Sequence, residues 1–80
     1  MKTYDAIKLR ILYLCEEKKM SIRKLANESG VAPSTIKNIL YGKSQNPGVV
    51  TIKMLCDGFG ITINDFFADQ LFYDLQQEIE

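Results

Sequence analysis

Polar side chains at helical spacing are the residues of this sequence best suited to chemistry. Four of them closely follow Pro33, namely Ser34, Thr35, Lys37 and Asn38. Hydroxyl, ammonium and carboxamide groups exchange hydrogen bonds with a target, and the shorter side chains let a helix approach it closely. The base edges in the major groove of DNA offer matching donors and acceptors. The pattern therefore indicates a helix whose exposed face reads bases.

Two short helices joined by a tight turn must position this face. Apolar spacing predicts helices over residues 21–29 and 33–41, with Gly30 between them. Ser21 is a good N-cap for the first helix, and glycine readily takes the left-handed conformation that ends helices. Pro33 suits the first position of the second helix, because no N–H is needed there. Two helices joined by a short turn that contains glycine form a helix-turn-helix.

Three further helices are predicted around this unit. Apolar residues recur at helical spacing over residues 4–18 and 50–59. Thr62 opens a short fifth helix, since its spacing to Asp65 is that of a capping box. Residues 42–48 are a loop by composition. No segment alternates as a strand does, so the expected fold class is all-α, with five helices in the repressor-like domain.

Residues 70–80 are expected to form an amphipathic helical extension, a sixth helix, of the helix-turn-helix domain that spans residues 1–69. The extension has an apolar stripe that is too large to leave in water. We expect a homodimer through this C-terminal helix, because one recognition helix alone makes a small interface with DNA. Alternatively, the stripe folds back on the first helix, beside Leu9, Leu12 and Tyr13. The stripe consists of Leu71, Phe72, Leu75 and Ile79.

The charges divide the chain into two parts. The 80 residues are enough for one small domain and have a net charge of zero. All ten Lys and Arg lie in residues 1–53, where four acids oppose them and leave a net charge of +6. Residues 54–80 hold the other six acids and no base, a net charge of −6. This division predicts a basic surface that is separate from an acidic one.

The remaining composition narrows the class of protein. No apolar run approaches the roughly 18 residues of a membrane span, and the first ten residues lack the apolar stretch of a signal peptide. We therefore expect a cytoplasmic protein with no membrane partner. Histidine is absent, and Cys15 and Cys56 are too few for a zinc site, so we expect no metal, disulfide or cofactor. Without a nucleophile–base pair, a phosphate loop or a sensor region, we expect neither an enzyme nor a small-molecule effector.

Several motifs together resemble a known family. They are the segment from Ser21 to Leu40, the loop YGKSQNP and the stretch TIKMLCDGFGITINDFF. In combination they resemble the Cro and phage-repressor helix-turn-helix family, also called XRE-like, over residues 6–67. The resemblance implies five helices, of which the second and third bind DNA. It also implies a small transcriptional regulator, a repressor, that binds double-stranded DNA in a sequence-specific way.

The same resemblance assigns the base-reading residues. Pro33, Ser34 and Asn38 fall where such repressors read bases, with Thr35 and Lys37 beside them. A carboxamide such as that of Asn38 pairs with adenine through two hydrogen bonds.

The same resemblance implies that a second group of residues holds DNA phosphates. Arg23 and Lys24 lie in the first turn of a helix, where cations oppose the helix dipole, and a phosphate docked there explains them. Such contacts position a protein on DNA without specifying sequence. The expected phosphate-binding residues are Ser21, Arg23, Lys24, Tyr41, Lys43, Ser44 and Asn46.

A function of another class stays open. A helix-turn-helix also serves as a protein-interaction module, for instance in an antitoxin-like partner. The zero net charge and the acidic C-terminal part agree with that alternative. Binding to DNA that weakens steeply with salt distinguishes the two functions, because counterion release accompanies only the contact with phosphates.

Overall fold

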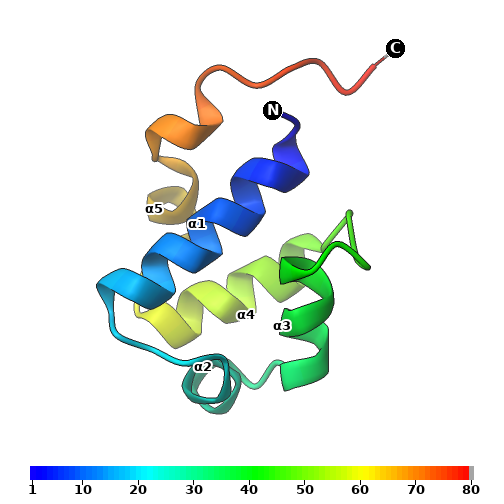
Figure 1. Cartoon of the computed structure of the whole chain (residues 1–80). Coiled ribbons are helices and arrows are strands. Elements are labelled where there is room, and N and C mark those ends of the chain that lie inside the picture. Colours follow the sequence, from blue (N-terminus) through cyan, green and yellow to red (C-terminus); the bar gives the residue numbers. More distant parts are fainter. Residues whose placement is uncertain (80) are drawn as a thin grey trace.

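The computed structural model describes residues 1–79 and is all-helical, which confirms the predicted fold class. Figure 1 shows α2 at one end of the molecule and residues 70–79, the C-terminal segment, coloured orange to red, at the other. Within the described residues no helix is both long and apolar enough to cross a membrane. The elements in chain order are α1 (Thr3–Glu17), α2 (Ile22–Ser29), α3 (Pro33–Leu40), α4 (Val49–Phe59), α5 (Ile63–Phe67) and the single 3₁₀ turn η1 (Gln70–Phe72).

One apolar core joins the five α-helices. Each helix turns its predicted apolar side inward, because burying that side removes it from water. Cys56 is fully buried in this core, whereas Cys15 is half-buried beside it, and both thiols are free. Burial raises the pKa of both thiols. The largest fully buried side chains are those of Ile11, Leu25, Ile36, Ile39, Leu55, Cys56 and Phe66.

The turn between α2 and α3 has the predicted form. Gly30 is left-handed, with φ of 75°, and its N–H donates to the carbonyl of Ala26 at 2.9 Å. The Ser21 hydroxyl accepts from the Lys24 N–H at 3.0 Å, so Ser21 is the N-cap of α2. These two ends fix the length of α2 and with it the place where α3 begins.

A close approach of α2 and α4 supports the turn from behind. Gly58 of α4 lies so near Ser29 that an ideal Cβ at position 58 would be 2.8 Å from the Ser29 Cβ and 3.0 Å from its main-chain nitrogen. Ser29 is buried, and its hydroxyl accepts from the Val31 N–H at 3.2 Å. Gly58, to which no role was assigned from the sequence, is the residue that makes this packing possible.

The predicted helix over residues 70–80 is wrong. Only one 3₁₀ turn forms at its start, and residues 73–79 are not helical; Glu80 lies outside the described residues. The Gln76 N–H donates to the carbonyl of Met1 at 3.0 Å, and the Lys2 ammonium donates to the carbonyl of Gln77. Main-chain groups bonded in this way are not available for a helix, and a helix of this length with acids at its C-terminal end is marginal in water.

The apolar stripe of this C-terminal segment is consequently divided. Phe72 packs on the core, with its ring centroid 4.9 Å from that of Phe67 and 6.1 Å from that of Phe66. Ile79 is 82% exposed. The segment folds back on the chain, which is the alternative arrangement, but without covering Leu12, which stays 42% exposed. A dimer formed by pairing two C-terminal helices has therefore lost its structural basis.

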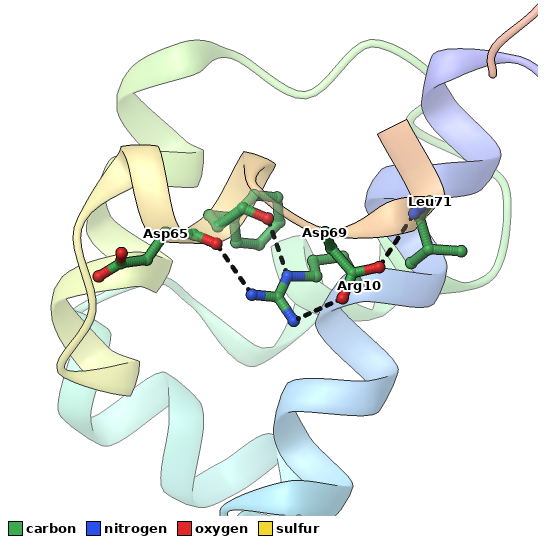
Figure 2. Close-up of polar contacts among 5 residues, drawn as sticks. Arg10, Asp65, Asp69 and Leu71 are labelled. Carbon is green, nitrogen blue, oxygen red and sulfur yellow. Dashed lines mark hydrogen bonds and ion pairs between the residues drawn. The ribbon is translucent and has the colours of Figure 1, made fainter. Parts of the chain in front are cut away.

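Arg10 fastens the start of this segment to α1 (Figure 2). Its guanidinium donates to the carbonyls of Phe66 and Asp65, at 2.8 and 2.9 Å, and to the Asp69 carboxylate at 3.3 Å. The two carbonyls belong to the last turn of α5, where a cation compensates the helix dipole. Asp69 in turn accepts from the Leu71 N–H at 3.0 Å, which begins η1. From the sequence, Arg10 was counted only among the basic residues, and this role was not predicted.

Candidate nucleic-acid interface

Helix α3 separates its apolar and polar side chains cleanly. Ile36, Ile39 and Leu40 are buried and hold the helix on the core. The predicted base-reading residues are all exposed on the remaining surface of the helix; they are Pro33, Ser34, Thr35, Lys37 and Asn38. The arrangement leaves hydroxyl, ammonium and carboxamide groups free to meet a target, as the major groove requires.

The N-terminus of α2 presents a second set of polar groups. Ser21 uses its hydroxyl oxygen as the cap acceptor and keeps its O–H as a donor. Arg23 is exposed and makes no ion pair within residues 1–79. Lys24 pairs with Glu28 at 2.8 Å, and this hydrogen bond lowers the pKa of the Glu28 carboxyl. A phosphate at this helix end therefore meets Arg23 unopposed but shares Lys24 with a carboxylate.

The loop between α3 and α4 is anchored to the end of α3. The Tyr41 and Ser44 N–H groups donate to the carbonyls of Lys37 and Asn38, at 2.8 and 2.9 Å. Gly42 permits the bend with a left-handed φ of 88°. Ser44 is half-buried, while Tyr41, Lys43 and Asn46 have exposed side chains, as phosphate ligands must.

The start of helix α4 adds main-chain N–H donors that were not predicted from the sequence. Gly48 is its N-cap and offers no side-chain acceptor, and the first helical N–H with a partner is that of Ile52. Within the described part of the chain, the N–H groups of Val49, Val50 and Thr51 have no acceptor. The first N–H groups of a helix and its dipole favour an anion. In the sequence, these donors are indicated by Gly48, which has no side-chain cap, at the point where the loop ends and the helix begins. The helix was predicted to begin at residue 50, one residue too late.

The separation of charge expected from the sequence is only partial in the structure, because Arg10 and Lys53 of the basic part pair with Asp69 and Asp57 of the acidic part. The C-terminal segment, with Asp74 and Glu78, lies at the opposite end of the molecule from α2 (Figure 1). Lys53 is neutralised by Asp57 on its own helix. Among residues 1–79, Arg23, Lys37 and Lys43 make no ion pair, and all three are exposed on α2, on α3 and in the loop that follows α3.

Comparison with known proteins identifies the family of the chain. A family model described as a Cro/C1-type HTH DNA-binding domain matches residues 10–70. The chain is similar in structure to the crystal structure of the prophage Lp1 protein 11, with a TM-score of 0.79 and 26% identity over 94% of this chain and 100% of that one. No curated protein matches the sequence. The match to the family model covers most of the chain, which therefore belongs to the Cro/C1-type helix-turn-helix family of DNA-binding domains.

Proposed function

We propose that this protein is a small transcriptional repressor that binds double-stranded DNA at specific sequences through α3. The observation that carries the proposal is the exposed polar face of α3, flanked by cations that no acid of residues 1–79 neutralises. Membership of a DNA-binding family supports it. A repressor of this size acts by occupying its DNA site. We assign the protein to the cytoplasm.

Base reading is assigned to the exposed face of α3. Asn38 pairs with adenine through its carboxamide, and Ser34 makes a more permissive contact. Pro33, Thr35 and Lys37 lie beside them on the same helix. Replacing any of these side chains changes which sequence is bound, since base contacts carry the specificity.

Phosphate contacts are assigned to the two sides of α3. Ser21, Arg23 and Lys24 approach the backbone from the N-terminus of α2. The loop after α3 and the first N–H groups of α4 approach the DNA backbone from the other side. The loop contributes Tyr41, Lys43, Ser44 and Asn46. Contacts on both sides of a recognition helix set its depth and orientation in the groove.

Binding as a homodimer is part of the proposal. Two half-sites about one helical turn apart double the contact area that one recognition helix offers. The C-terminal segment contributes exposed apolar side chains to such a contact, because Tyr73 is 72% and Ile79 82% exposed. Sedimentation of the full chain, alone and with DNA, measures the stoichiometry directly; one chain per bound duplex would contradict the dimer.

Binding to random-sequence duplex at increasing salt tests the proposal. We expect the affinity to fall steeply with salt, and Arg23→Ala and Lys43→Ala each to reduce the slope by about one. Lys53→Ala is the control, since that cation already pairs with Asp57. Absence of binding at low salt would contradict the function and favour the protein-interaction module. Selection from a random DNA pool then gives the operator.

A further inference from the structure

The C-terminal end of α3 depends on a side chain from α1. The last four carbonyls of a helix have no partner within it and need one elsewhere. In α3 the carbonyls of Lys37 and Asn38 accept from N–H groups of the following loop. The carbonyl of Ile39 accepts instead from the Tyr4 hydroxyl, at 2.9 Å. Tyr4 therefore supports the end of α3 from a position 35 residues earlier in the chain.

Tyr4 also lies where the loop leaves α3. A Cβ placed on Gly42 would be 3.8 Å from the Tyr4 hydroxyl, so this hydroxyl is next to the left-handed bend. A hollow of about 460 Å³ lies between the first turn of α1 and the loop, and Tyr4, Gln45, Asn46 and Pro47 all line it. The loop thus lies beside the first turn of α1, with this hollow between them and the Tyr4 hydroxyl at its Gly42 end.

The first turn of α1 is itself held in place. The Lys2 N–H donates to the Asp5 carboxylate at 3.0 Å, and the Thr3 N–H donates to the Glu78 carboxylate at 3.0 Å. These two bonds satisfy donors that the start of a helix leaves unpaired. Because Glu78 comes from the C-terminal segment, the loop after α3 is supported by both ends of the chain.

We propose that Tyr4 is a positioning residue for DNA binding, which rests on the proposed function. By holding the Ile39 carbonyl, its hydroxyl fixes the end of the recognition helix and the direction of the loop that carries Tyr41, Lys43 and Asn46. Tyr4 does not touch DNA in this account. It acts through the geometry of residues that do.

Tyr4→Phe tests this proposal, because it removes the hydroxyl and keeps the ring. In the free protein we expect faster hydrogen exchange of the Ser44 amide, whose bond to Asn38 lies at the same helix end. We expect DNA affinity to fall about three- to tenfold, the worth of one hydrogen bond. The salt dependence of binding should be unchanged, since no cation is lost. Tyr13→Phe is the matched control on the same helix, where the side chain is 50% exposed.

The outcomes separate the two proposals. If the parent protein binds DNA and Tyr4→Phe binds equally well, with Ser44 exchange unchanged, the positioning role is overturned and the proposed function stands. If the parent binds no DNA, the proposed function fails, and Ser44 exchange alone decides whether Tyr4 holds the loop. If Tyr4→Phe and Tyr13→Phe lose the same DNA affinity, the positioning role of Tyr4 is also overturned. Thermal unfolding of both variants verifies that each is folded at the temperature of the measurement.

Discussion

The helix-turn-helix and the C-terminal segment are held by different kinds of contact. In α2 and α3 the anchoring side chains are fully buried, with Leu25 and Ile36 at 0% exposure. Residues 73–79 are held mainly by hydrogen bonds to Met1 and its neighbours at the surface. Surface hydrogen bonds contribute little net free energy, because water replaces them readily, whereas buried apolar area contributes more. We therefore expect the C-terminal segment to open before the helix-turn-helix does.

The largest expected effect contrasts one leucine from each region. Leu25→Ala should lower the free energy of unfolding by about 2–5 kcal/mol, because it leaves a cavity in the core. Leu75→Ala should lower it by about 1 kcal/mol or less, since Leu75 is only partly buried. Urea denaturation of both variants measures the difference. Equal losses would show that the C-terminal segment belongs to the cooperative core and would break the comparison.

Gly58→Ala probes how tightly the helix-turn-helix is seated on α4. The new methyl group meets the Cβ and the main chain of Ser29, so α2 must move away. We expect overpacking to lower the free energy of unfolding by about 1–3 kcal/mol, although alanine has a higher helix propensity than glycine. The melting temperature measures the loss. An unchanged or higher melting temperature would mean that α2 yields at little cost and that the unit is less rigid than its burial indicates.

The same comparison explains what the sequence alone revealed. The first residues of α2 and α5 and the last residue of α2 were predictable. Ser21 and Thr62 cap the two helix starts, Gly30 ends α2, and each acts on its immediate neighbours. The exposed face of α3 followed from helical periodicity. The bonds of Arg10 to Phe66 and of Thr3 to Glu78 join residues 56 and 75 positions apart, and no local pattern encodes them. The helical stripe over residues 70–80 was a local pattern that these distant contacts overrode.

The end of α1 offers a smaller effect, of opposite sign. Lys19 is left-handed, with φ of 55°, in the position that Gly60 takes after α4. In both turns the next N–H, of Met20 or of Ile61, reaches back to the last turn of its helix. A lysine in this conformation is strained, so Lys19→Gly should raise the free energy of unfolding by about 1 kcal/mol. A decrease measured by urea denaturation would show that the strain is negligible.

The smallest expected effect concerns acid and the C-terminal segment. The Thr3 N–H holds the pKa of the Glu78 carboxyl below its ordinary value. The bond between Thr3 and the Glu78 carboxylate is therefore fully formed at pH values above the ordinary pKa of a glutamate, about 4.3. It is lost as the pH falls through the lowered pKa of Glu78. The protection factor of the Gln76 amide, which is its exchange rate relative to that of an unfolded chain at the same pH, should fall in that range, while the amides of α2 keep their protection. Simultaneous loss of protection in both regions would contradict the difference between them.

The central claim is that the exposed face of α3 reads bases while the cations around it hold phosphates. Affinities of the parent protein and of Asn38→Ala for the selected operator and for random duplex, at one salt concentration, test it most directly. We expect Asn38→Ala to lose about 1–3 kcal/mol on the operator, the worth of a bidentate base contact, and almost nothing on random duplex. Equal losses on the two DNAs would place Asn38 on the phosphate backbone and contradict the claim.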